Sequence, residues 1–148
     1  MKQFTYSLDQ LDTILQQHII PLLNHPSILL FTGPLGAGKT TLIKELLSSY
    51  TLAEPITSPT FTYVNLYHDI SGITFHHFDL YRLLSLEEFI AAGFHELLLD
   101  ETSHSFVEWP SILIPFLHEH RTSKKIYALS LEYHHQDTSL RTLSLTPL

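Results

Sequence analysis

Residues 27–41 read SILLFTGPLGAGKTT, and the arrangement of residues in this segment predicts the fold. Within it, residues 33–40 match the phosphate-binding pattern G-x-x-x-x-G-K-[ST] at every fixed position. The apolar run 27–32 predicts a buried strand before the pattern, and residues 41–47 predict a helix after it. A strand, a glycine-rich loop and a helix in this order are typical of a nucleoside triphosphate site; a glycine turn that only caps a helix is the alternative.

The loop supplies the groups that hold a bound triphosphate. Its glycines let successive backbone N–H groups turn toward phosphate oxygens. Lys39 reaches the outer phosphates, where we also assign it a catalytic role, and the Thr40 hydroxyl can ligate Mg²⁺. The predicted nucleotide-binding residues are Gly33, Pro34, Leu35, Gly36, Ala37, Gly38, Lys39, Thr40 and Thr41.

Length and composition favour one compact domain over residues 1–148. A chain of 148 residues buries about 70% of its unfolded surface when it folds as one domain. Its length leaves no room for a second catalytic domain. The absence of cysteine excludes a disulfide framework and a cysteine-ligated zinc site. No apolar run approaches the roughly 20 residues of a membrane span, and residues 1–6 do not resemble a secretory signal. We therefore expect a cytoplasmic protein that does not contact a membrane.

The charge balance bears on nucleic-acid binding. The formal net charge is −7, from 15 acidic against 8 basic residues, which argues against a broad surface for RNA or DNA. The 11 histidines would lower this negative charge when protonated. Pairs such as His76-His77 suggest metal ligands, but adjacent strand side chains face opposite ways, and no third ligand stands at a recognisable spacing. We expect no histidine metal site.

The pattern along the chain predicts an α/β fold. A capping box at residues 7–10 starts a helix that runs to Pro21 and precedes the first core strand. Residues 61–67 and 73–78 flank a polar turn and predict an antiparallel hairpin. Short helices are predicted at 85–93 and 94–99, and strands at 105–107, 125–132 and 140–145. We expect a P-loop NTPase-like three-layer sandwich whose mixed central sheet includes antiparallel strands.

Two acidic residues that follow predicted strands are candidates to complete the site. Asp79 follows the run 73–78, and Glu108 follows the strand 105–107. Strand ends of one polarity frame the ligand crevice of an open α/β sheet, and a phosphate loop needs an acidic partner for Mg²⁺. We assign Mg²⁺ to Thr40 with Glu108 and water activation to Asp79, although spacing leaves the two acidic roles interchangeable. A helix cap or a surface ion pair is the alternative for either acid.

Ser58 and Thr60 lie in the proline-bounded loop before the hairpin. Hydroxyls in such a loop can contact Mg²⁺ or sense the terminal phosphate, as switch loops do. They are also common turn residues. We treat both as candidate switch contacts.

Basic residues are scarce in the middle of the chain. Arg82 is the only lysine or arginine between Glu45 and His120. Small-molecule kinases use several cations to clamp donor and acceptor, and fast NTPases often add an arginine. We therefore expect slow hydrolysis by the isolated chain, and an arginine supplied by a partner can raise such a rate roughly 10³- to 10⁵-fold.

Four segments resemble the bacterial TsaE family, also called YjeE. They are residues 33–41, Ser58-Pro59-Thr60-Phe61, His77-Phe78-Asp79-Leu80-Tyr81-Arg82 and Val107-Glu108-Trp109-Pro110. Their order and spacing match that family over roughly residues 7–133. The last three segments are far more specific than the phosphate loop.

The resemblance implies a Mg²⁺-dependent ATPase needed for the threonylcarbamoyl modification of adenosine beside the anticodon, in tRNAs that read codons beginning with A. TsaE-like proteins do not transfer the group themselves. They act with the TsaD and TsaB proteins, and their ATP cycle is thought to reset or remodel that complex. Carried over by position, the resemblance places the phosphates on residues 33–41, Mg²⁺ near Thr40 and Glu108, and an essential acidic role on Asp79.

Other positions are less fixed by the resemblance. Arg82 contacts a partner or a phosphate, or else supports the fold. The Trp109 side chain either responds to nucleotide binding or only packs against its neighbours. Pro34 departs from the polar residue expected there and removes one N–H without breaking the motif. The match is weak after Tyr133, so the role of the C-terminal hairpin stays open.

Two further readings remain beside the ATPase. One is a nucleotide-dependent binding switch, in which ATP orders residues 58–61 to dock a partner and hydrolysis is incidental. The other is a small-molecule kinase, which needs cationic clamps that this chain barely supplies. The preference for ATP over GTP rests on the resemblance, because the chain has no Asn-Lys-x-Asp element to read the base.

Overall fold

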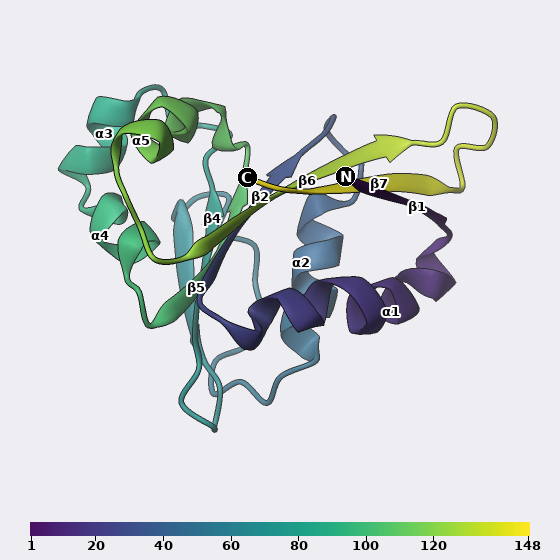
Figure 1. Cartoon of the computed structure of the whole chain (residues 1–148), viewed down its shortest axis with the longest axis horizontal. Coiled ribbons are helices and arrows are strands. Elements are labelled where there is room, and N and C mark those ends of the chain that lie inside the picture. Colours follow the sequence, from purple (N-terminus) through teal and green to yellow (C-terminus); the bar gives the residue numbers. More distant parts are fainter.

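A computed structural model describes residues 1–148. Its centre is a seven-stranded sheet in the order β1-β7-β6-β2-β5-β4-β3 (Figure 1). The four central strands β6, β2, β5 and β4 are parallel, and antiparallel strands extend both edges. The strands are β1 (Lys2–Tyr6), β2 (Ser27–Thr32), β3 (Val64–His68), β4 (Thr74–Asp79), β5 (Ser103–Glu108), β6 (Lys125–Tyr133) and β7 (Arg141–Pro147).

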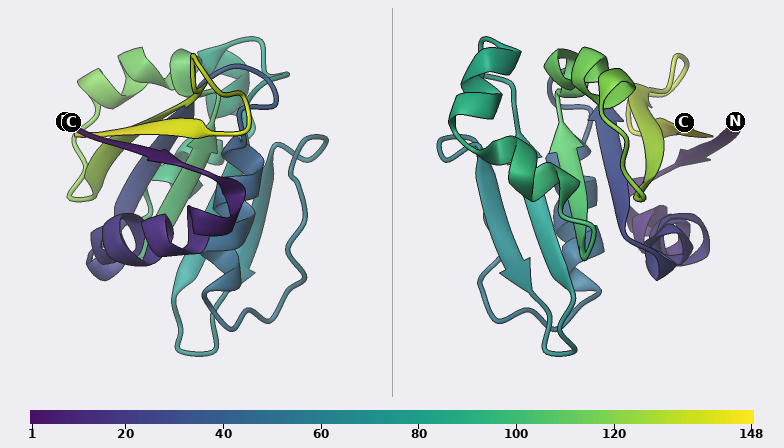
Figure 2. Two further views of the ribbon diagram at one scale, coloured as in Figure 1. Left: turned by 90° about the vertical axis from the view of Figure 1, so that its right-hand side faces the viewer. Right: turned by 60° about the vertical axis from the view of Figure 1, so that its left-hand side comes forward.

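Helices cover both faces of this sheet (Figures 1 and 2). Those on one face are α1 (Leu11–Ile14), with the helical turns that extend it to Asn24, and α2 (Lys39–Ser48). Those on the other are α3 (Leu86–Ala91), α4 (Phe94–Leu99) and α5 (Ile114–Glu119). The three-layer α/β sandwich with a mixed sheet is therefore confirmed. None of the helices combines the length and apolar character needed to span a bilayer.

Strand β2 divides the core between the two layers. Leu29 and Phe31 point to the face of α1 and α2, whereas Ile28 and Leu30 point to the face of α3, α4 and α5. All four side chains are almost completely buried. A parallel strand covered on both faces reads as a continuous apolar run, which explains why the sequence identified this strand.

The parallel register brings functional side chains to one edge of the sheet. Strands β2, β5 and β4 end side by side, with Phe31 opposite Glu108 and Glu108 opposite Asp79. The chain then enters the phosphate loop from the end of β2. The carboxyl ends of parallel strands therefore place this loop and both acidic residues together.

Some elements differ from the sequence predictions. Strand β1 was not predicted, and it pairs antiparallel with β7 at the sheet edge. The strand expected at 61–67 begins only at Val64, because residues 59–63 form a turn in which the Tyr63 N–H donates to the Pro59 carbonyl at 2.8 Å. The helical segment expected to end at Pro21 continues as a 3₁₀ turn at Ile20–Asn24, where proline occupies an early position that needs no N–H donor.

Candidate functional site

A cleft of about 420 Å³ lies at the edge where the parallel strands end. It is lined by Leu35, Gly36, Gly38, Lys39, Thr40, Thr41, Thr60, Asp79, Tyr81, Arg82, Glu108 and Trp109. Most residues singled out in the sequence therefore converge on one cavity. Gly33, Pro34, Ala37 and Ser58 do not line it, and Tyr81 lines it although it was noted only as part of a family segment.

The phosphate loop depends on glycine at three positions. Gly33, Gly36 and Gly38 have φ values of +133°, +78° and +104°, in the region that side chains disfavour. A Cβ on Gly33 would also lie 2.0 Å from the Leu131 carbonyl oxygen of β6. Space is open around Gly38, so there only the backbone conformation requires glycine.

Lys39 opens α2 and holds its ammonium group in the cleft. Its Nζ donates to the carbonyl oxygens of Gly33 at 2.8 Å and Pro34 at 3.0 Å, and lies 3.9 Å from the centre of the Trp109 ring. Burial lowers the pKa of Lys39, and the negative charges of Glu108 and Asp79 oppose that shift. Burial has the larger effect of the two, and the ammonium group lies beside two carboxylates at the phosphate loop.

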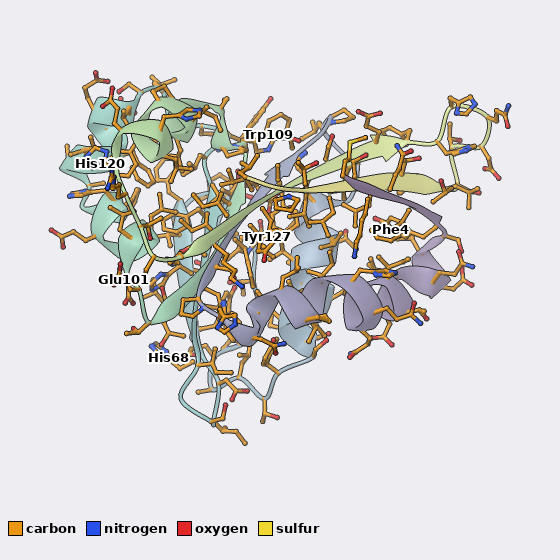
Figure 3. The ribbon with its side chains drawn as sticks, viewed as in Figure 1. Phe4, His68, Glu101, Trp109, His120 and Tyr127 are labelled. Atoms are coloured by element: carbon orange, nitrogen blue, oxygen red, sulfur yellow. The ribbon has the colours of Figure 1, made fainter.

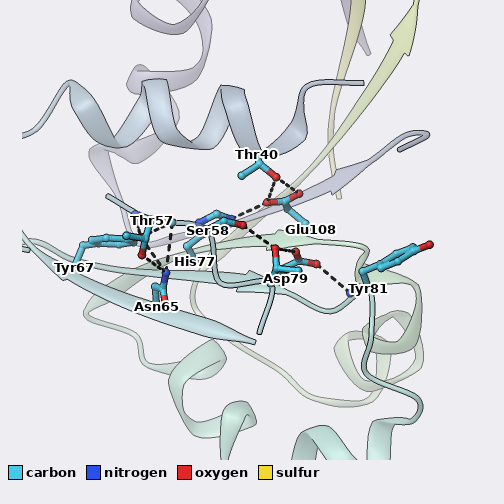
Figure 4. Close-up of polar contacts among 10 residues, drawn as sticks. Thr40, Thr57, Ser58, Asn65, Tyr67, His77, Asp79, Tyr81 and Glu108 are labelled. Atoms are coloured by element: carbon cyan, nitrogen blue, oxygen red, sulfur yellow. Dashed lines mark hydrogen bonds and ion pairs between the residues drawn. The ribbon is translucent and has the colours of Figure 1, made fainter. Parts of the chain in front are cut away.

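Glu108 is the centre of a buried polar cluster (Figure 4). The Thr40 hydroxyl donates toward both carboxylate oxygens, at 2.9 and 2.8 Å, and His77 Nε2 lies 2.8 Å from Oε1. His77 is fully buried and Glu108 is 2% exposed. The Nδ1 atom of His77 has no partner, so the neutral tautomer with its hydrogen on Nε2 fits best, because it leaves no buried N–H unpaired.

Sequence analysis assigned His77 no role of its own. It was noted only within a family segment and as half of a histidine pair. One signal was available: His77 lies two residues before Asp79 on the same strand, and side chains two apart share a face. On β5, Phe106 and Glu108 are likewise two residues apart, so their side chains also share a face.

Asp79 joins β4 to the loop that carries the candidate switch residues. Its Oδ2 accepts a hydrogen bond from the Thr60 hydroxyl at 3.2 Å, and its Oδ1 accepts one from the Tyr81 N–H at 3.1 Å. The Thr60 and Ser58 hydroxyls lie 2.8 Å apart. Both predicted switch residues are thus linked to Asp79, Thr60 directly and Ser58 through Thr60.

Aromatic rings close the other side of the cleft. Trp109 follows β5 with a φ of +57°, and its N–H donates to the Phe31 carbonyl at 3.2 Å. The Trp109 and Tyr81 rings are 4.9 Å apart, and Arg82 lies 4.8 Å from the centre of the Phe61 ring. The Trp109 ring also packs directly on the Lys39 ammonium group.

The oxygen donors of the cleft suit a hard cation that also keeps ligands from outside the protein. No group of three or more histidine, cysteine, aspartate or glutamate side chains forms a protein-only metal cage. Thr40 and Glu108 offer a hydroxyl and a carboxylate in contact with each other. Mg²⁺ is commonly bound through one or two such protein oxygens, with phosphates and water completing its shell.

Comparison with known proteins agrees with this geometry. A family model described as threonylcarbamoyl adenosine biosynthesis protein TsaE matches residues 7–142. The chain belongs to the TsaE family. This family takes part in tRNA threonylcarbamoyladenosine biosynthesis, so the resemblance found in the sequence is confirmed.

Individual TsaE proteins are similar over part of their length. The Borreliella burgdorferi protein is 39% identical over 94 residues, which are 64% of this chain and 67% of that protein. The Treponema pallidum protein is 41% identical over 88 residues, which are 60% of this chain and 63% of that protein. The crystal structure of Bacillus subtilis YdiB has the same fold, with a TM-score of 0.62, 23% identity, and coverage of 99% of this chain and 86% of that one.

Proposed function

We propose that this TsaE-family protein is a Mg²⁺-dependent ATPase that acts as an accessory factor in the threonylcarbamoyl modification of tRNA. The observation that carries the proposal is the convergence of Lys39, Thr40, Asp79 and Glu108 in one cleft. Family membership supports the tRNA pathway, and the TsaD and TsaB partnership follows from the same resemblance. ATP is preferred over GTP on that basis as well.

The phosphate loop and Lys39 bind the triphosphate in this proposal. Backbone N–H groups of residues 38–41 would face the phosphate oxygens, while the Lys39 ammonium group would exchange its two loop carbonyls for the outer phosphates. Thr40 and Glu108 would hold Mg²⁺, which neutralises charge on the phosphate oxygens when bound. His77 keeps the Glu108 carboxylate oriented through its Nε2 contact.

Asp79 orients the attacking water. This residue is 7% exposed and lines the cleft, and its carboxylate is held by the Thr60 hydroxyl and the Tyr81 N–H. Hydrolysis forms a bond from the water oxygen to the terminal phosphorus and breaks the bond to the bridging oxygen, which yields ADP and phosphate. A fixed acceptor for a water hydrogen bond is what this step requires from the protein.

The cleft carries only two protein cations, Lys39 and Arg82. Arg82 lies over the Phe61 ring, on the loop that bears the candidate switch residues. Slow turnover of the isolated chain follows, because few positive charges stabilise the transition state. A partner that supplies a further cation would accelerate hydrolysis.

A nucleotide-dependent binding switch is the second candidate. The hydrogen-bond chain from Ser58 through Thr60 to Asp79 favours it, because a change at Asp79 would be felt by the loop. In this version ATP orders the loop for a partner, and hydrolysis is incidental.

ATP turnover by the Asp79→Asn variant tests the proposal. We expect turnover, alone and with TsaB and TsaD, to fall by roughly 10² or more while calorimetric ATP affinity stays within a few fold, since Asp79 acts on the water. Asp9→Asn, at an exposed position, is the matched control. If Asp79→Asn supports repeated tRNA modification at the wild-type rate, hydrolysis is dispensable and the switch is the function.

A further inference from the structure

The hairpin of β6 and β7 lies against the phosphate loop from outside the cleft. Arg141, the first residue of β7, donates from Nε to the Ala37 carbonyl oxygen at 3.2 Å. The two residues are 104 positions apart in the sequence. Neither Arg141 nor Tyr133 lines the cleft, so the hairpin supports the loop rather than the ligand.

The Arg141 guanidinium is held by three carbonyl acceptors and one aromatic ring. Nη1 donates to the Thr138 carbonyl at 2.6 Å and to the Leu140 carbonyl at 3.0 Å. Its planar group lies 4.3 Å from the centre of the Tyr133 ring, and Tyr133 is the residue opposite Arg141 on β6. Tyr6 is opposite Arg141 on β1, the strand that the sequence did not predict. A side chain held in this way loses little further freedom when it binds the loop.

Two other loop residues touch the same hairpin. A Cβ on Gly33 would lie 2.0 Å from the Leu131 carbonyl oxygen, and a Cβ on Gly36 would lie 2.8 Å from the Tyr133 hydroxyl. Gly33, Gly36 and Ala37 therefore pack on the hairpin, whereas Lys39 and Thr40 face the acidic side of the cleft.

We propose that Arg141 is a positioning residue that holds the phosphate loop in its nucleotide-binding conformation. This inference rests on the proposed function. The loop uses backbone conformations that are accessible but not strongly favoured, so a contact from outside raises the fraction of molecules ready to bind. Apparent affinity scales with that fraction, whereas turnover at saturation does not. By linkage, bound nucleotide stabilises the hairpin in return.

Replacing Arg141 separates affinity from turnover. We expect Arg141→Gln to weaken calorimetric ATP binding and raise KM by about tenfold, with kcat changed by less than about twofold. Arg141→Lys should recover part of the affinity, because one ammonium group can reach the same carbonyl. Arg121→Gln, at an exposed position on the loop before β6, is the matched control.

Hydrogen exchange tests the reciprocal effect. The His134 and Leu140 amides donate within the hairpin turn, to the carbonyls of Leu140 and Asp137. We expect ATP to slow their exchange in the wild type and to lose most of this effect in Arg141→Gln.

Several outcomes would overturn the inference. A folded Arg141→Gln variant with wild-type ATP affinity and wild-type exchange would do so while leaving the ATPase proposal intact. A wild-type protein that binds no ATP would overturn both. If Arg141→Gln fails to fold, Tyr133→Leu decides, because it removes the stacked ring and spares the turn carbonyls; unchanged affinity in that variant would refute the positioning role.

Discussion

A buried lysine lies near each end of β5, and the two lysines have different charged and polar neighbours. At the carboxyl end, Lys39 is 4% exposed and lies near Glu108 and Asp79. At the amino end, Lys124 is also 4% exposed, and its Nζ donates to the Leu98 carbonyl and to the hydroxyls of Ser103 and Ser105, at 3.0, 3.3 and 3.0 Å. Figure 3 separates the two regions, with Trp109 at the first end and Glu101 near the second.

The comparison shows why burial alone does not identify a functional lysine. Burial lowers the pKa of Lys124 to about 8, and the more distant Asp100 opposes that shift. The Lys124 charge contributes, after burial itself, to lowering the pKa of His104 to about 4. The Lys124 ammonium group donates to a carbonyl of α4 and to two serine hydroxyls, so its N–H donors are used within the fold. Lys39 instead has carboxylates and an open cleft before it.

Matched methionine variants give the largest expected contrast. Lys39→Met should weaken ATP binding by roughly 10² or more, since the phosphate loop loses its cation. It should change the unfolding midpoint less than Lys124→Met does, because water in the open cleft can solvate the two loop carbonyls that lose their donor. Lys124→Met should leave ATP affinity within about twofold and lower the free energy of unfolding by about 1–3 kcal/mol, because buried acceptors lose their donor. Calorimetry and urea unfolding measure both quantities. Equal effects of the two variants on ATP binding would show that the two lysines do not differ in function.

The pH dependence of stability provides a second contrast between the two lysines. Lys124 has a pKa of about 8 in the folded protein, below the ordinary lysine value of 10.5. Between these values the unfolded chain binds more protons, so stability should rise with pH across this window, by up to about 3 kcal/mol. The measurement is the difference in unfolding free energy between wild type and Lys124→Met from pH 7 to 11. A difference that stays constant with pH would show that Lys124 titrates normally.

The sequence predicted the carboxyl end of the sheet far better than the amino end. A contiguous motif encodes the phosphate loop, and Asp79 and Glu108 stand directly after apolar strands, so strand polarity was enough to bring them together. Lys124 sits beside Lys125 in a polar stretch that reads as a solvated surface. Only the packing of α4 against β5 buries it.

Long-range contacts were also beyond the sequence. The Arg141 contact with Ala37 joins residues 104 positions apart, and β1 gains its place only by pairing with β7. No local pattern encodes either feature. Pairing in the tertiary structure, rather than local β propensity, determines whether such an edge strand forms.

The neighbouring histidines His76 and His77 give the smallest and most specific test. His77 contacts Glu108 at 2.8 Å, whereas His76 lies on the other face, 2.9 Å from the Leu97 carbonyl and 3.3 Å from the Ser103 hydroxyl. We expect His77→Leu to raise the Mg²⁺ concentration for half-maximal ATPase by about tenfold, because Glu108 loses the group that orients it. His77→Gln, whose amide can donate to the same oxygen, should recover most of that loss.

His76→Gln is the control for that test, because it changes a buried histidine one residue away without touching the cleft. It should alter stability and leave the Mg²⁺ requirement unchanged. If both positions shift the Mg²⁺ requirement equally, the effect belongs to the packing of β4 rather than to the Glu108 contact. A shift confined to position 77 would instead mean that alternation along one strand separates a residue that tunes the site from one that secures the fold.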